Sequence, residues 1–140
     1  MSLAIKSREP AVIVLDQDAF FPVLSVVEFR IWFKTESEGQ ETRVGEELQF
    51  AIDKTNEYLS FLKEEFDVWT APKSRVYKRA VYYLCAANLY KFHLLQALNS
   101  EEELTEAEIV EKFNAVYDES MRDLKKPSLR RHPKSIARMI

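Results

Sequence analysis

The sequence predicts an all-α protein: a small bundle of about four helices with an extended N-terminal arm and a basic C-terminal tail. Its 140 residues include only two glycines and five prolines, too few for a β-rich chain that turns every ten residues or so. Alanine, leucine, glutamate and lysine are abundant and favour helices. The length suits one domain with its own core. We expect an arm at 1–20, a helical domain at 21–126 and a basic tail at 127–140.

The first elements are an arm and a short helix. Residues 11–15 (AVIVL) are apolar and mostly β-branched, which predicts either a short strand or an extended arm. Ser25 is followed three residues later by Glu28, the spacing of a capping box that opens a helix. A polar stretch followed by Gly39 is expected to end this helix. The apolar side of the helix is expected to consist of Val26, Phe29, Ile31, Trp32 and Phe33.

The second helix has the clearest pattern. From Val44 onward, apolar or small residues recur in steps of three and four, which places them in one stripe over about six turns. The stripe consists of Leu48, Ala51, Thr55, Tyr58, Leu62 and Phe66. The residue before a proline is pushed out of the helical region. We therefore expect residues 67–72 to be a connection and the third helix to start near Ser74.

The third helix contains the stretch KRAVYYLCAANLYKFHLL, residues 78–95. Only eleven uncharged residues lie between Arg79 and Lys91, whereas a membrane span needs about twenty. We therefore expect a central, buried helix and no membrane association. Thr105 and Glu108 form a second capping-box pattern, which opens a fourth helix that stops at Pro127. The predicted core combines Leu48, Tyr58, Leu62, Leu84, Ala87, Phe113 and Leu124.

Charge is distributed unevenly along the chain. Residues 1–124 hold all 23 acidic side chains against 14 basic ones, a net charge of −9. Residues 125–140 hold six basic side chains and no acidic one. Such a tail, which also has two prolines, is expected to be extended when free and to bind a partner or merely to aid solubility.

The residues that usually carry catalysis are sparse. His93 and His132 are too few for a zinc site of ordinary spacing, and no carboxylate-x-x-His pair suggests a metal centre in a bundle. Cys85 lies among apolar residues, where a packed thiol is expected rather than a nucleophile. The chain has no glycine-rich phosphate loop. We therefore expect no enzyme, no cofactor and no metal site, and synthesis in the cytosol.

Two basic groups are candidates for partner binding. The first comprises Lys73, Arg75, Lys78 and Arg79 at the start of the third helix. The helix dipole disfavours cations at this end, so their placement indicates an anionic partner, although a solvated edge is the alternative. The second group is in the tail and comprises Arg130, Arg131, Lys134 and Arg138.

Several short stretches resemble one family. They are Phe21-Pro22, Leu24-Ser25 and Glu28-Phe29-Arg30, then Leu48, Ala51, Asn56 and Leu59, then the run Tyr77-Lys78-Arg79-Ala80-Val81-Tyr82 with Ala86, Ala87 and Leu89. In order and approximate spacing, residues 20–124 resemble the head-completion protein family (GPL) of contractile-tailed, temperate bacteriophages. The run YKRAVY is the most specific element of this likeness.

The resemblance implies a non-enzymatic virion protein of a phage or prophage, made in the bacterial cytoplasm. Such a protein is a head–tail connector that docks on the portal or connector ring of the filled head, as a homo-oligomer, and meets a tail-side completion protein. Contact with packaged DNA stays open. The alternatives are a small helical nucleic-acid-binding or regulatory protein, which a net charge of −9 over residues 1–124 disfavours, and an enzyme built on a bundle.

Overall fold

The computed structural model describes residues 15–33, 41–91 and 105–126, and these segments contain helices and no strand. The helices are α2 (Val26–Trp32), α3 (Glu41–Leu59), α4 (Ala71–Lys91) and α5 (Glu106–Lys125), and the short 3-10 helix η2 (Ser60–Glu64) follows α3 directly. The described segments confirm the predicted all-α bundle. The candidate strand at 11–15 lies outside them except for Leu15, and the basic tail lies outside them entirely.

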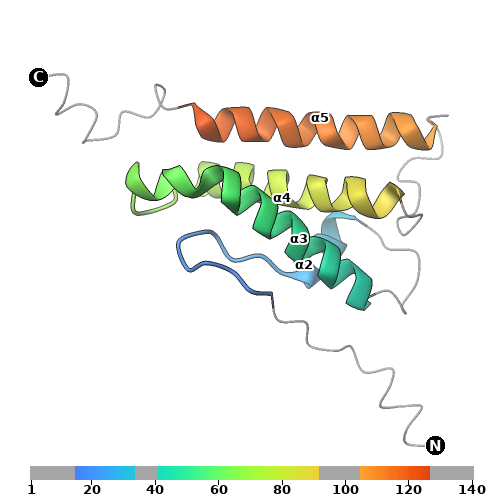
Figure 1. The fold of residues 1–140 in the computed structure, drawn as a ribbon, viewed down its shortest axis with the longest axis horizontal. Helices are drawn as coiled ribbons and strands as arrows, with labels where there is room; N and C mark the ends of the chain where they lie inside the picture. Colours follow the sequence, from blue (N-terminus) through green and yellow to red (C-terminus); the bar gives the residue numbers. More distant parts are fainter. Residues whose placement is uncertain (1–14, 34–40, 92–104, 127–140) are drawn as a thin grey trace, which may run out of the picture.

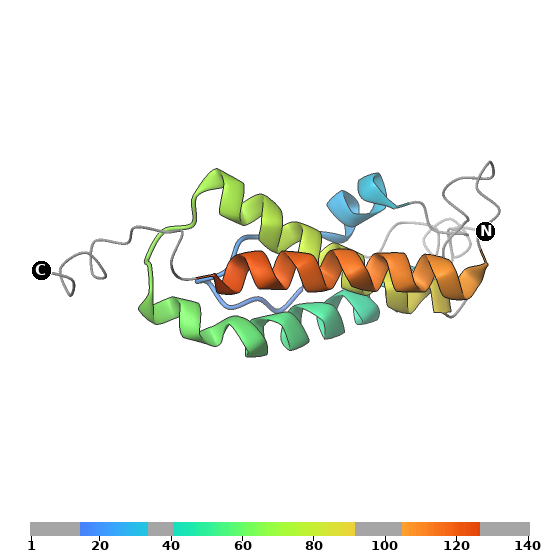
Figure 2. The same cartoon turned by 90° about the horizontal axis from the view of Figure 1, so that it is seen from above.

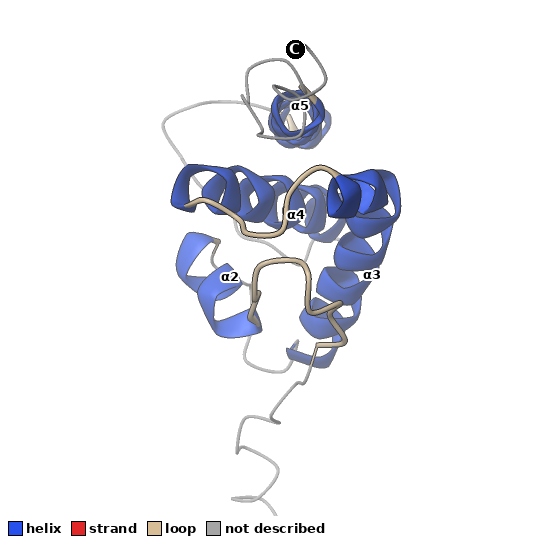
Figure 3. Ribbon diagram, turned by 90° about the vertical axis from the view of Figure 1, so that its left-hand side faces the viewer, coloured by secondary structure: helices blue, strands red, loops and turns tan. Residues whose placement is uncertain are grey.

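Helix α4 is the centre of the bundle. Figure 1 and Figure 3 show α5 packed on one side of α4, with α2 and α3 on the other side. The chain direction reverses from α3 to α4 and again from α4 to α5, which runs across α4 in the view from above (Figure 2). The buried residues of α4 are Tyr77, Ala80, Val81, Tyr82, Leu84, Cys85, Ala86, Ala87 and Leu89. They surround most of the helix, as expected of an element covered on several sides.

The predicted capping box at Ser25 is only half formed. The Ser25 hydroxyl accepts the Glu28 backbone N–H at 2.9 Å, as expected. The Glu28 carboxylate does not return to the cap; it accepts hydrogen bonds from Lys78 Nζ at 3.1 Å and from the Tyr82 hydroxyl. The Ser25 N–H instead donates to the Tyr82 oxygen at 3.2 Å. The prediction for the Glu28 side chain is therefore wrong, because bonds to α4 replace the local one.

Two other helix starts show what local sequence determines. The capping box of α5 is complete, since Thr105 Oγ1 accepts the Glu108 N–H and Glu108 Oε1 accepts the Thr105 N–H, each at 3.2 Å. Helix α4 begins at Ala71, earlier than the expected start near Ser74. Thr70 caps it by accepting the Lys73 N–H at 3.3 Å. Pro72 is tolerated there because first-turn N–H groups have no partner within the helix.

The segment before α2 is bonded to α3 and α4. The Asp16 N–H donates to Gln49 Oε1 at 2.7 Å, and Gln49 Nε2 donates back to the Asp16 carbonyl at 2.8 Å. Gln17, Asn56 and Tyr77 form a closed ring of side-chain hydrogen bonds in which each donates to the next. Such linked bonds strengthen one another in a low-dielectric site. Residues 16 and 17 are thus held on the helical unit.

The described helices share one hydrophobic core, and the predicted core residues lie in it with one exception. Leu48, Leu62, Leu84, Ala87, Phe113 and Leu124 are all buried. Tyr58 was wrongly placed there: its side chain is 52% exposed. Its position lies at the edge of the buried stripe of α3, where the ring turns toward α5 and lies 5.4 Å from the Lys125 ammonium. Cys85 is buried, and burial raises the pKa of its thiol, as expected of a packed residue.

Buried tyrosines predict a loss of stability at alkaline pH. Burial raises the pKa of Tyr77, Tyr82 and Tyr117, and the hydrogen bond to Glu28 raises that of Tyr82 further. This stabilisation is complete below the pKa of an unfolded tyrosine, about 10. It is lost as pH rises above that value, because the unfolded chain ionises first. Urea midpoints should therefore fall above about pH 10, less steeply in Tyr82→Phe. Midpoints that fall equally in both proteins would contradict the role of Tyr82.

Candidate partner-binding surface

The four predicted basic residues of α4 lie on its first three turns but differ in their surroundings. Lys78 is paired with Glu28, and the Lys73 ammonium lies 3.9 Å from the centre of the Phe66 ring. Arg75 is exposed and makes no ion pair or hydrogen bond within the described residues. The group predicted from sequence is therefore one outward-facing arginine beside cations that have contacts within the fold. The tail residues Arg130, Arg131, Lys134 and Arg138 lie outside the described residues.

Arg79 joins α4 to α5. Its Nε donates to Ser120 Oγ at 2.9 Å, and its guanidinium lies 3.8 Å from the Asp123 carboxylate. Ser120 is fully buried and donates its own hydroxyl hydrogen to the Val116 carbonyl at 2.8 Å. The Ser120 hydroxyl thus has a hydrogen-bond partner both as an acceptor and as a donor. The contact was not foreseen, because a serine within an apolar stripe gives no signal of which cation will reach it.

Exposed apolar side chains lie on α2 and just before it. Val27 and Ile31, four residues apart on the helix, are 72% and 78% exposed, and Val23, which precedes the helix, is 81% exposed. Phe29 and the C-cap residue Phe33 are buried. The expectation that Ile31 belongs to the buried side is therefore wrong, because two residues, or about 200° around the helix, separate it from Phe29; Trp32, also expected there, is 39% exposed. The regular spacing of Val23, Val27 and Ile31 was the signal in the sequence.

A shallow groove lies between the end of α2 and the first turns of α4. It has a volume of about 430 Å3 and is lined by Trp32, Pro72, Arg75, Val76 and Arg79. The Trp32 ring packs edge-on against Tyr82 with 5.0 Å between ring centres and remains 39% exposed. We call the exposed side chains of Val23, Val27, Ile31, Trp32 and Arg75 the α2 flank. Contiguous exposed apolar groups with an arginine beside them are typical of protein–protein interfaces.

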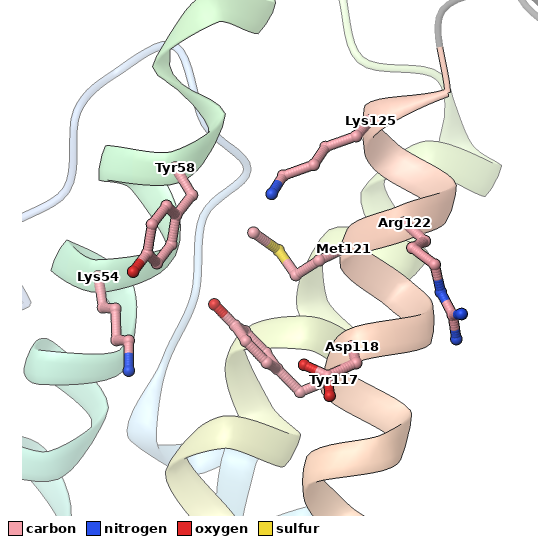
Figure 4. A pocket seen from close by; sticks show the side chains of 7 residues that line it. All are labelled: Lys54, Tyr58, Tyr117, Asp118, Met121, Arg122 and Lys125. Carbon is pink, nitrogen blue, oxygen red and sulfur yellow. The ribbon is translucent and has the colours of Figure 1, made fainter.

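A second concavity separates α3 from α5 (Figure 4). It has a volume of about 560 Å3 and is lined by Lys54, Tyr58, Tyr117, Asp118, Met121, Arg122 and Lys125. Figure 4 shows the Lys125 side chain extending across it toward Tyr58, whereas Arg122 points away. The lining has no histidine or cysteine and one carboxylate. These groups can hold an anionic or aromatic group by contact, but they do not form an acid–base pair or an activated nucleophile.

The described residues contain no cluster of three or more histidine, cysteine, aspartate or glutamate side chains that could hold a metal ion. None of their helices combines the length and the apolar character needed to cross a bilayer.

Comparisons with known proteins give no match. No protein-family model, no curated protein and no solved structure matches this chain. The likeness to head-completion proteins therefore rests on the sequence pattern described above. Function is inferred from that pattern and from the chain's own surfaces.

Proposed function

We propose that this chain is a head-completion protein of a phage or prophage, a head–tail connector without enzymatic activity. It docks on the portal or connector ring of the filled head and prepares the head for tail attachment. In the assembled particle it is a homo-oligomer and contacts a tail-side completion protein. The observation that carries this proposal is the α2 flank, an exposed apolar surface on a small helical body.

The α2 flank supports a role in assembly because it is costly to leave uncovered. Three branched apolar side chains in a row are each more than 70% exposed. Full burial of one such side chain contributes about 1.5 to 3 kcal/mol. A partner that covers the row therefore gains free energy without any chemical step. Neither of the two concavities described above, the groove beside Trp32 and the one between α3 and α5, contains a catalytic constellation that would compete with this interpretation.

The rigidity of the body also supports an adaptor role. Phe20, Phe21, Phe66, Trp69 and Tyr77 form an aromatic cluster with ring centres 5.0 to 5.9 Å apart. This cluster and the Gln17–Asn56–Tyr77 hydrogen-bond ring fix the N-terminal segment on the helices. A surface that is already ordered loses little conformational entropy on binding. The body is thus ready to bind without rearrangement.

The basic tail is proposed as the contact that guides docking. Its four cations, which follow Lys125 and Lys126, are joined to a chain whose first 124 residues carry a net charge of −9. The tail is therefore attracted to acidic surfaces on the body of a neighbouring copy or on the portal ring. Charge of this kind speeds association and orients partners more than it adds affinity. Apolar surfaces such as the α2 flank then hold the assembled complex together.

We expect the full-length protein to bind purified portal rings and filled, tailless heads at low salt, as measured by co-sedimentation. Truncation after Pro127 should slow the association with heads and reduce its dependence on salt, as a time course of co-sedimentation shows, because charge complementarity acts mainly on the rate of association. A matched variant keeps the length but replaces Arg130, Arg131, Lys134 and Arg138 by glutamine. It should behave like the truncation if charge is the cause.

Absence of binding by the full-length protein would refute the head-completion proposal. Unchanged binding after truncation would remove only the tail's part in it. Duplex DNA is the control for the rival function: tight binding that falls steeply with salt would favour a nucleic-acid-binding protein. Lys78 and Arg79 already contact Glu28 and Ser120, which leaves Arg75 as the main outward cation on this part of α4.

A further inference from the structure

Helix α3 carries a second exposed apolar surface. Phe50 and Phe61 are 54% and 40% exposed, and their positions lie on the side of α3 and η2 opposite the buried stripe. Residues 46–61 carry four acidic side chains and one basic side chain, Lys54. Glu46, Glu57 and Glu64 are exposed and make no ion pair within the described residues. We call Phe50 and Phe61, with these three glutamates, the α3 flank; Tyr58 is not part of it, because its ring faces α5 and Lys125.

The two flanks belong to different helices of the lower layer. Figure 3 shows α2 and α3 beneath α4, with α2 toward one lateral face and α3 toward the other, and the two helices contact each other. Their chemistry is complementary. The α2 flank is aliphatic with an exposed arginine, and the α3 flank is aromatic with exposed carboxylates. An arginine near an aromatic and acidic surface can form both ion pairs and cation–π contacts.

We propose that copies of this chain associate head to tail, with the α2 flank of one copy against the α3 flank of the next. This deepens the proposed function, on which it rests, by naming the surfaces that join neighbouring copies. A contact between two different surfaces leaves one of each free at the ends, so it generates a ring or an open chain rather than a closed dimer. A stable interface needs about 800 Å2 from each partner. Flanks of a few side chains each therefore give weak association, which a portal ring would reinforce by holding copies together.

The arrangement can be tested by blocking one flank at a time. Ile31→Glu places a carboxylate in the α2 flank, where it repels the glutamates of the next copy. Phe50→Glu removes the most exposed ring of the α3 flank and adds a further acid. Both sites are more than half exposed, so the fold is expected to be retained, which circular dichroism checks. Val68→Glu is the matched control, since Val68 is 78% exposed and belongs to neither flank.

Sedimentation equilibrium measures the mass of the oligomers in the absence of heads. Protein concentrations up to about 1 mM reveal weak contacts. For the wild-type and Val68→Glu proteins, the average mass should rise above that of a dimer as concentration increases. Each flank variant alone should associate about tenfold more weakly or worse. An equimolar mixture of the two variants should stop at a dimer, because each supplies the flank that the other lacks and the two altered flanks repel one another.

Several outcomes would overturn the proposal. Wild-type protein that stays monomeric over the whole range has no such contact. A variant that associates like the wild type shows that the contact runs through the tail or another surface. A variant that forms dimers alone indicates a symmetric contact. Wild-type protein that binds heads but does not self-associate would refute this inference and leave the proposed function standing. Wild-type protein that self-associates through the two flanks but does not bind heads would refute the proposed function and leave the contact between copies standing.

Discussion

Replacing Phe29 by alanine is expected to lower the free energy of unfolding by about 3 to 5 kcal/mol. Phe29 is fully buried, and its ring centre lies 5.4 Å from that of Phe33 and 5.8 Å from that of Tyr82. Truncation leaves a cavity at the point where α2 meets α4, and a well-packed interior collapses into such a cavity only in part. Urea unfolding followed by circular dichroism measures the loss.

Val27→Ala is the matched control for Phe29, because Val27 lies on the same helix and is 72% exposed. Exposed substitutions usually change stability by less than about 0.5 kcal/mol. If Phe29→Ala leaves no folded baseline, Phe29→Leu removes less volume and keeps the comparison measurable. Equal effects of Phe29→Ala and Val27→Ala would show that α2 does not pack through its aromatic side.

Leu84→Ala is expected to cost about 2 to 5 kcal/mol. Leu84 is 5% exposed on α4, the helix that all the other described helices surround. The cost is the lost transfer free energy of the side chain together with the cavity that remains. Val68→Ala, at a site that is 78% exposed, should be close to neutral. A urea midpoint for Leu84→Ala equal to that of Val68→Ala would remove Leu84 from the core.

Features set by neighbouring residues were predictable from the sequence. The predicted stripe from Val44 to Phe66, which runs along α3 and continues through η2, is buried except at Tyr58. Within α3, a period of 3.6 residues places those positions on one side whatever the partner is. The α5 cap at Thr105 formed as expected, since both of its bonds join residues three apart. The central place of α4 followed from the width of its apolar surface, which a helix covered on one side would not need.

Features set by distant residues were not predictable. Glu28 left its predicted local bond for Lys78, 50 residues away, and Tyr82, 54 residues away. Which cations of α4 face outward was equally hidden, because the partner of Arg79 is 41 residues away. The position of Ile31 depends on how α2 is rotated about its axis. Phe29 and Ile31 are about 200° apart around the helix, so only one of the two can face the core, and contacts with α4 determine that it is Phe29.

The contact between Arg79 and Ser120 has a consequence for how α5 is positioned lengthwise. Apolar stripes on two antiparallel helices are nearly periodic, so sliding one helix by a turn brings leucines and valines against similar neighbours. A polar contact is not periodic. A slide of one turn, about 5.4 Å, would separate the buried Ser120 hydroxyl and the Asp123 carboxylate from the Arg79 guanidinium. The buried hydroxyl would then lose one of its hydrogen bonds, which is unfavourable. The hydrogen bond of 2.9 Å between Arg79 and Ser120 thus favours one register of the two helices. Apolar packing holds α5 along α4, and this polar contact selects the lengthwise position of α5.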